Sequence, residues 1–298
     1  MTRLVVLLAA LLAAAAAVQG SQATFTASAA NAGASFATAS NFQPAVTLTA
    51  PAAGATTTAL PTLSGAAGNS TGDSPTVNVK IYSGSTATGT PVQTKAVTRS
   101  TTTWTWTLTT ALAAGTYTAQ ATQTDTGGLT GTTAAVTFTV DATKPTATSV
   151  AATNKAGGTA GKIENGDTVT FTYSEPIAAA SVWSGWNGSS TSVNVRFTNS
   201  SLADTFTILT ATTGTINLGS VATNGNYVSA TTTFASTMVR SADGASIVVT
   251  LGTPANVQST PVTAKNMTWT VGAGITDLAG NAIATPASYT ETVSDVDF

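Results

Sequence analysis

Apolar residues alternate with threonine and other polar residues along most of the chain, a pattern typical of half-buried β-strands. In residues 136–140, for example, Val, Phe and Val alternate with two threonines. A glycine-containing turn at residues 124–128 precedes this strand. Residues 141–145 end it, because Pro145 cannot donate to a strand ladder. The pattern therefore predicts an all-β chain of short strands separated by turns.

The same order of turn, strand and aspartate recurs near the C-terminus. Residues 276–281 form the second turn, residues 288–293 form the second strand, and Asp295 follows. A repeated arrangement of this kind indicates two β modules in series. We place the first module at residues 45–141 and the second at residues 142–298.

Alternation predicts seven short strands in the first module, which is the number in an immunoglobulin-like (Ig-like) sandwich. Their apolar positions are Val46 and Leu48; Leu60 and Leu63; Val77, Val79 and Ile81; Val92 and Val97; Trp104, Trp106 and Leu108; Tyr117, Ala119 and Ala121; and Val136, Phe138 and Val140. We expect Trp104 and Trp106, which alternate with threonine, to lie in the core.

The second module is longer and less regular. Its predicted strands are residues 169–173, 193–197, 206–208, 216–218, 247–251 and 267–271. Residues 176–188 form either one helical turn around Ser181 or a loop.

The amino-acid composition excludes several classes of function but adds little to the fold prediction. The 298 residues suffice for an export signal and two domains of ordinary size. Ten Lys+Arg against 12 Asp+Glu create no field that would attract nucleic acid. Histidine and cysteine are absent, which removes the commonest general base, the usual zinc ligands, thiol nucleophiles and disulfides. From the charge balance we expect no nucleic-acid partner, and from the missing side chains we expect none of these catalytic or metal-binding groups.

Residues 1–20 have the features of a signal peptide. Arg3 gives a basic start, residues 4–18 are apolar, and Ala15, Ala17 and Gly20 offer cleavage positions. The alternative is an uncleaved anchor, although the run is short against the roughly 20 residues that a span requires. The sequence shows neither a GPI-like tail nor an LPxTG-like motif before a hydrophobic segment. We expect a secreted, extracellular or cell-wall-associated protein without a stable membrane span after cleavage.

Four segments of the first module resemble the Ig-like repeats of bacterial surface and adhesion proteins: PAVTLTAPAAGATTTALPTLSGAAG, VNVKIYSG, GTYTAQATQTD and FTVDATKP. Two segments of the second, NGDTVTFTYSEPI and ITDLAGNAI, are similar to Ig-like domains of bacterial surface-layer and cell-wall proteins. The chain departs from the family at Thr126-Gly127-Gly128, where the family has Ala-Gly-Asn after the turn aspartate. The resemblance implies two tandem Ig-like β-sandwich domains with a structural or adhesive role and no catalysis.

Residues 21–44 form a leader rich in Ser, Ala and Asn. It is too short for a core of its own, but residues 23–27 are predicted as a short strand with Phe25 as its apolar anchor. The leader resembles the mature start of the camelysin/TasA group of exported fibre proteins. That resemblance implies self-assembly through the leader, beside contacts with cell-surface or matrix components. The alternative is a disordered leader.

The Ig-like resemblance also implies a calcium site. In tandem bacterial Ig-like proteins, acidic residues at the domain joint bind Ca²⁺, which takes about six to eight oxygen ligands. The positions implied here are Asp125 and Asp141, together with Asp277 and Asn281. The alternative is that Asp125 stabilises a turn and Asp141 ends a strand without an ion. No other cofactor is expected.

Trp183 and Trp186 form a second candidate site, in the segment WSGWNG. Tryptophan faces beside amide groups can hold sugar rings, so a carbohydrate- or cell-wall-binding module is the alternative function. The competing structural interpretation places both indoles in the core or over it.

Carboxylates are the remaining candidate chemistry. Glu164, Asp167 and Glu175 lie close together in sequence, and Glu291 is the other glutamate. A pair held roughly 5–10 Å apart could hydrolyse glycosides. Asp167 and Glu175 also occupy ordinary turn and strand-end positions, and the sequence contains no nucleophile motif. We expect the protein not to be an enzyme.

Overall fold

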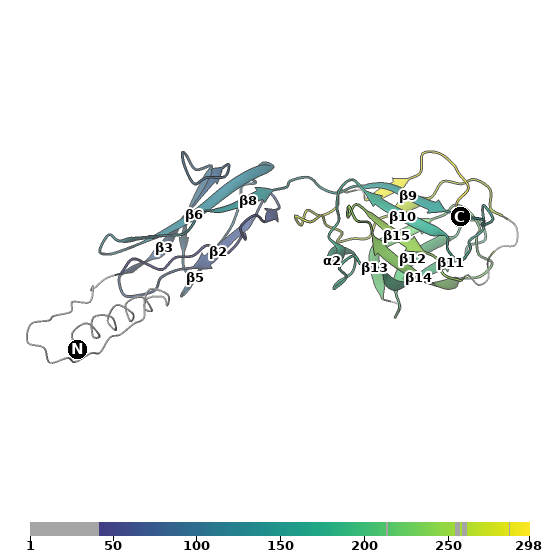
Figure 1. The fold of residues 1–298 in the computed structure, drawn as a ribbon, viewed down its shortest axis with the longest axis horizontal. Helices are drawn as coiled ribbons and strands as arrows, with labels where there is room; N and C mark the ends of the chain where they lie inside the picture. Colours follow the sequence, from purple (N-terminus) through teal and green to yellow (C-terminus); the bar gives the residue numbers. More distant parts are fainter. Residues whose placement is uncertain (1–41, 213, 254–256, 258–260, 286) are drawn as a thin grey trace, which may run out of the picture. The chain divides into compact units, whose positions relative to one another are not determined.

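The computed structural model describes residues 42–212, 214–253, 257, 261–285 and 287–298. The predicted signal peptide, the strand at residues 23–27 and most of the leader lie outside these residues. Contacts divide the chain into two units, Met1–Asp141 and Ala142–Phe298. Strands dominate both units, and the one-turn helix α2 (Ala179–Val182) lies in the second (Figure 1). The predicted all-β, Ig-like fold is confirmed.

The first unit is a sandwich of two sheets. Its strands are β1 (Thr56–Thr57), β2 (Thr62–Ala66), β3 (Asp73–Ser83), β4 (Gln93–Thr98), β5 (Thr103–Thr107), β6 (Gly115–Asp125), β7 (Thr130–Thr132) and β8 (Val136–Val140). The larger sheet has the order β1-β8-β6-β3-β4, with β7 also paired to β6, and β2 pairs with β5 in the smaller one. The segment at Val46 and Leu48 extends the smaller sheet, because Thr47 N–H and Thr49 N–H donate to carbonyls of β2.

The predicted alternation places the core of the first unit between these sheets. Along β3, Val77, Val79 and Ile81 are buried, while the polar residues between them face solvent. Trp104 is 1% exposed, and its Nε1–H donates to Thr47 O at 3.0 Å, so it joins packing to a hydrogen bond across the smaller sheet. Trp106 is half-buried at the edge of the core. The core prediction therefore holds fully for Trp104 and in part for Trp106.

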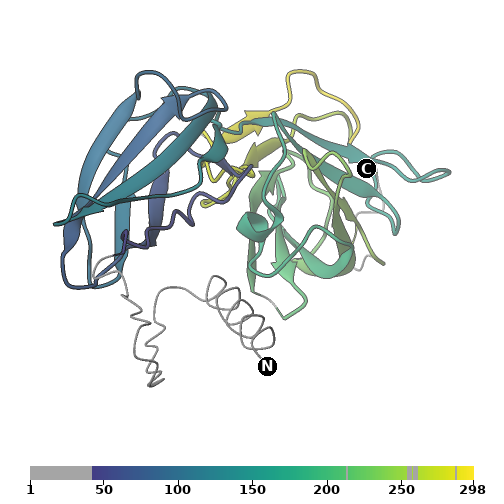
Figure 2. The same cartoon turned by 60° about the vertical axis from the view of Figure 1, so that its left-hand side comes forward.

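The second unit is built on one continuous sheet. Its strands are β9 (Ala147–Thr153), β10 (Thr168–Tyr173), β11 (Thr191–Thr198), β12 (Thr205–Thr210), β13 (Thr215–Ala222), β14 (Thr232–Arg240), β15 (Ser246–Thr250), β16 (Thr268–Thr270) and β17 (Ser288–Thr290). Their order is β17-β16-β13-β12-β11-β14-β15-β10-β9. The two end strands, β17 and β9, contact each other, so the sheet curves round on itself and its two halves face each other (Figure 2).

Aromatic side chains fill the space inside this curved sheet. Trp269 is fully buried and meets the rings of Phe171 and Tyr173 edge-on at 5.0 and 5.2 Å between centroids. Phe197 contacts three further rings, those of Phe206, Phe234 and Phe298. The Phe197–Phe206 pair is tilted and the others are edge-to-face, and aromatic pairs of this kind stabilise a core beyond the area that they bury.

The structure departs from the expected strands in both units. The short strands β1 and β7 of the first unit and the strands β9 and β14 of the second were not predicted. β14 buries Thr232 and Ser236 in alternation with Phe234 and Met238, so half of its inward positions are polar in the sequence. β17 ends at Thr290, before the predicted end at residue 293. Glu291 N–H still donates to Met267 O, and after an interruption Asp295 pairs with Lys265 in an isolated bridge. Of the two alternatives for residues 176–188, the helical turn is present.

Candidate functional site

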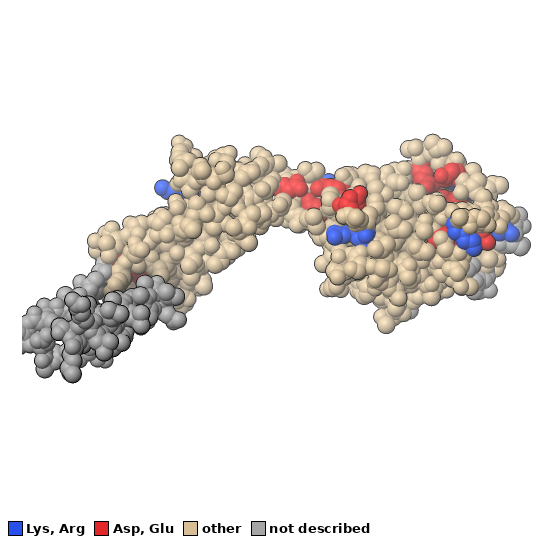
Figure 3. All heavy atoms as spheres, in the orientation of Figure 1, with Lys and Arg blue, Asp and Glu red and all other residues tan. Residues whose placement is uncertain are grey.

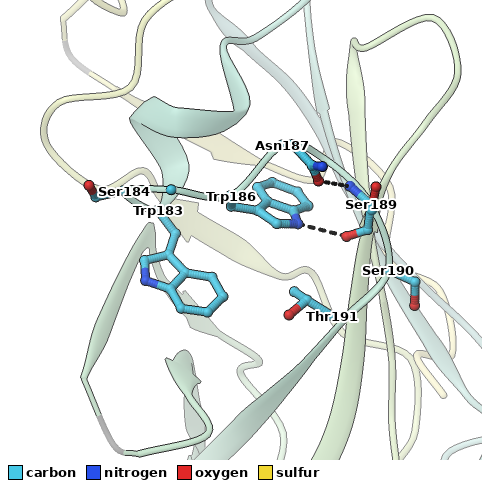
Figure 4. Close-up of a pocket in the computed structure, with 8 residues that line it drawn as sticks. Trp183, Ser184, Trp186, Asn187, Ser189, Ser190 and Thr191 are labelled. Atoms are coloured by element: carbon cyan, nitrogen blue, oxygen red, sulfur yellow. Dashed lines mark hydrogen bonds between the residues drawn. The ribbon is translucent and has the colours of Figure 1, made fainter.

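Trp183 and Trp186 come together at the rim of the second unit. Helix α2 ends at Val182, and Trp186 N–H donates to Trp183 O at 3.0 Å, which closes a turn through Gly185 at φ +82°. The two indoles and the loop after them line a hollow of about 330 Å³ (Figure 4). Residues 183–187 and 189–191 form its wall, and none of them is charged.

Trp186 forms the fixed wall of this hollow. It is 6% exposed, and its Nε1–H donates to Ser189 O at 2.7 Å. Asn187 Oδ1 accepts Ser189 N–H at 3.0 Å, and Arg240 N–H donates to Gly188 O at 3.0 Å. These bonds hold the loop between α2 and β11 in one conformation. The structural interpretation of Trp186 as a core residue is therefore correct for this side chain.

Trp183 is only half-buried, and it packs against the core from the edge of the hollow. Hydrogen bonds to two other segments hold its helix. Asn217 Nδ2 donates to Ser181 O at 2.9 Å. Ser181 Oγ accepts Thr276 N–H at 3.0 Å, and Ala178 N–H donates to Thr276 O at 2.9 Å. Both tryptophans of the motif therefore line one hollow. The sequence did not show that Trp186 is buried and Trp183 is accessible.

The structure does not bring Asp125 and Asp141 together. Asp141 follows Val140, which pairs with Gly115 at one end of β6, whereas Asp125 is the last residue of β6 at the other end. An 11-residue strand places the two carboxylates on the order of 30 Å apart. Since ligands of one ion lie within a few ångströms, Asp125 and Asp141 cannot share a calcium ion.

Asp125 stabilises the turn in which it lies. Its Oδ1 accepts Leu129 N–H at 2.8 Å, while its Oδ2 is buried and has no hydrogen-bond partner among the described residues. The turn interpretation of Asp125 is therefore seen in the structure. One unused hard oxygen is also a fit for a cation, although it supplies a single ligand.

Asp277 and Asn281 form a more complete version of this turn. Asp277 is 2% exposed; its Oδ1 accepts the N–H groups of Gly280 and Asn281, and its Oδ2 accepts Asn281 Nδ2 at 2.8 Å. A carboxylate oxygen of Glu175 lies within 4.8 Å of one of Asp277. Two carboxylates this close provide part of a cation's ligand set.

The candidate hydrolytic pair is separated by a strand. Glu164 and Asp167 precede β10 and Glu175 follows it, and a strand of six residues spans about 17–20 Å. That distance exceeds the roughly 5–10 Å of paired glycosidase carboxylates. Asp167 is fully buried and accepts the N–H groups of Lys155 and Glu164, so it closes a loop. Glu175 therefore does not form a catalytic pair with Glu164 or with Asp167.

Sequence reasoning missed a group of acids at the C-terminal end of the second unit. Carboxylate oxygens of Glu291, Asp295 and Asp297 lie within 4.8 Å of one another. Asp297 is 1% exposed, and burial, with the charges of Glu291 and Asp295, raises its pKa to about 7. Tyr227 OH donates to Asp297 Oδ2 at 3.5 Å, and burial raises the pKa of this hydroxyl. The sequence shows that Glu291, Asp295 and Asp297 lie within seven residues of one another. It does not show that Asp297 is buried.

Sequence reasoning also missed Asp204, which is fully buried. Its carboxylate accepts three backbone N–H groups, from Ser200 at 2.9 Å, Tyr227 at 2.6 Å and Val228 at 2.8 Å. It therefore ties two loops to each other.

No helix in the part of the chain that the structure describes is both long and apolar enough to cross a membrane.

Of the two units, the first has the clearest similarity to known proteins. None of the curated proteins compared with the chain matches its sequence. Among solved structures, the fibronectin(III)-like modules of Clostridium thermocellum CbhA match with 15% identity, 70% of this chain and 93% of that one, at a TM-score of 0.31. Dimeric latent PorU from Porphyromonas gingivalis matches with 14% identity, 74% and 20% of the two chains, at 0.28. Escherichia coli alpha-2-macroglobulin activated by porcine elastase matches with 13% identity, 80% and 23%, at 0.25.

TM-scores this low carry no inference about function. The match that bears on the fold comes from the sequence. Residues 47–142, about a third of the chain, match the family model of a bacterial Ig-like domain, and they coincide with the sandwich of the first unit.

Proposed function

We propose that the protein is exported and serves as a non-catalytic Ig-like protein at the cell surface or outside the cell, with a structural or adhesive role. The observation that carries this proposal is the match of residues 47–142 to a bacterial Ig-like domain, whose sandwich fold generally serves as a non-enzymatic module. On the face in Figure 3, charged side chains are few and gather in small groups of both signs.

Export is the first part of the proposal to test. Fractionation of the native host should place the protein in the medium or the cell-wall fraction, with its N-terminus formed by cleavage near Gly20. Recovery from the cytoplasm with Met1 retained would overturn the proposed location. N-terminal sequencing of the purified protein supplies the second readout.

Self-assembly through the leader is the second part. An extended segment can complete a sheet edge of another copy, which propagates head-to-tail. Deletion of residues 21–42 should then abolish assembly, as followed by light scattering and electron microscopy. Mature protein that stays monomeric at high concentration would rule out this assembly.

Calcium is the third part, at residues that hold unused or crowded carboxylate oxygens. An ion bound by the folded state raises the melting temperature by mass action. Asp125→Asn and Asp277→Asn should each remove the part of the calcium response that their unit contributes, and Asp243→Asn, at an exposed loop, is the control. A melting curve that is the same in calcium and in chelator would dismiss the ion.

A further inference from the structure

We propose that the hollow between Trp183 and Trp186 binds a neutral saccharide, with Trp183 as the surface on which a sugar ring stacks. The site rests on the proposed function, since it gives an adhesive role its ligand class. Figure 4 shows both indoles at the same hollow, with Thr191 beside them.

The chemistry of the wall selects the ligand. The wall combines two indoles with the hydroxyls of serine and threonine residues and with the Asn187 amide. Pyranose rings have an apolar C–H face for an indole and a rim of hydroxyls that both donate and accept hydrogen bonds. A surface of this composition therefore matches a sugar better than it matches a purely apolar ligand.

The absence of charge in the wall excludes ionic ligands. None of the residues that line the hollow is acidic or basic. Arg240 lies against Gly188, but its Nη1 donates to Ile177 O at 2.7 Å, which directs the guanidinium to the backbone. A carboxylated or phosphorylated sugar would lose water without gaining a partner. The ligand that fits is uncharged.

The loop is held in place before any ligand arrives. Gly188 has φ +94°, and a side chain there would meet Arg240 Nε at 2.9 Å, so the loop depends on glycine at this position. Trp186 and Asn187 each bond to Ser189. Binding to a rigid loop avoids the entropic cost of ordering it. At about 330 Å³ the hollow is at the lower end of small-molecule sites, which suits a short stretch of a longer glycan.

Calorimetric titration of the purified protein tests the site. The probes are cellohexaose, maltohexaose and the hexamer of N-acetylglucosamine, with hexagalacturonate as the anionic comparison and a tryptic digest of serum albumin as the peptide comparison. At least one neutral hexasaccharide should bind saturably and quench tryptophan fluorescence. Trp183→Ala should weaken its binding by about tenfold, and Trp183→Tyr should restore most of the affinity.

The matched control is Trp106→Ala, which removes a half-buried tryptophan from the first unit and should leave binding unchanged. Melting curves establish that each variant is folded. The site is wrong if no neutral hexasaccharide binds, if Trp183→Tyr and Trp183→Ala bind as the parent does, or if hexagalacturonate or the peptides bind instead. If no saccharide binds, the proposed site is wrong, but the proposed export and surface location still stand. If the protein binds a saccharide but is intracellular, the site stands and the proposed function is wrong.

Discussion

The turn at Asp125 in the first unit and the turn at Asp277 in the second share one backbone pattern. In each, the aspartate N–H donates to the carbonyl four residues on, Leu129 O at 3.0 Å and Asn281 O at 3.1 Å. In each, Oδ1 accepts the N–H of that residue at 2.8 Å. The second oxygen differs. Asn281 Nδ2 donates to Asp277 Oδ2, whereas Asp125 Oδ2 is buried without a hydrogen-bond partner in the described part of the chain.

The difference shows what a buried carboxylate needs. Taking it out of water is costly, and each N–H that it accepts offsets part of the cost. Asp204 has three such donors, whereas Asp297 accepts a long hydrogen bond of 3.5 Å from Tyr227 OH and has two acids close by. The number of donors, more than burial itself, should decide whether each aspartate stabilises its unit.

Asp204→Ala should have the largest effect, because it leaves three buried N–H groups without their acceptor. We expect the second unit to lose about 3–5 kcal/mol of its free energy of unfolding. Hydrogen exchange of the intact chain, read by mass spectrometry, should show faster exchange in residues 199–228 and unchanged exchange in the first unit. Leu202→Ala, at an 84% exposed position of the same region, is the control. Equal protection in Asp204→Ala and the parent would show that the Asp204 carboxylate does not hold these two loops together.

Asp297 should reverse the usual dependence of stability on pH. Its pKa is about 7 in the folded protein against about 3.9 when unfolded, so the folded state holds the proton more tightly. The second unit therefore loses stability as pH rises from about 4 to about 7, and the loss stays constant above that. Its size is on the order of 2–4 kcal/mol. Glu291, whose pKa burial also raises, and Asp295 add negative charge at this group.

Asp297→Asn is the variant that isolates this effect. It should be more stable than the parent above pH 7, with an advantage that vanishes as the pH approaches 4. Denaturant unfolding at several pH values measures the difference between the two proteins. The contributions of distant acids cancel in it, while Glu291 and Asp295 remain coupled to Asp297. A difference that does not change with pH would show that Asp297 is ionised freely in the folded state.

The sequence predicted the parts of this picture that depend on local pattern. Alternation predicted the longer strands of the first unit but not the short β1 and β7, and the turn residues predicted both aspartate turns. It could not show the role of Asp204, because two of its donors, Tyr227 and Val228, lie more than 20 residues away and meet it through the sheet. Nor could it separate Trp186 from Trp183, since burial depends on how β11 and the helix pack.

Asn281→Leu converts the turn of the second unit into that of the first. It removes the donor to Asp277 Oδ2 and leaves a carboxylate oxygen buried without that bond. We expect the second unit to lose about 1–3 kcal/mol. Unfolding in denaturant, with hydrogen exchange of the second unit as the readout, measures this loss. Asn281→Asp is not a suitable control, since it adds a charge; Leu278→Asn, at a 65% exposed position of the same turn, is the matched one. A stability unchanged by Asn281→Leu would mean that the amide contributes nothing.

Leu129→Asn performs the opposite conversion and has the smallest expected effect. Leu129 is 43% exposed, so replacing it sacrifices little apolar burial, and the new amide occupies the position that Asn281 holds in the other turn. It should donate to Asp125 Oδ2 and stabilise the first unit by about 1 kcal/mol, a gain that few surface substitutions give. Leu129→Ala, which removes the same side chain and adds no donor, separates the hydrogen bond from the loss of an exposed leucine. If the two variants melt together, the unpaired oxygen of Asp125 is not a cost to the fold. If only the asparagine variant gains stability, the two units differ at this turn by one missing donor.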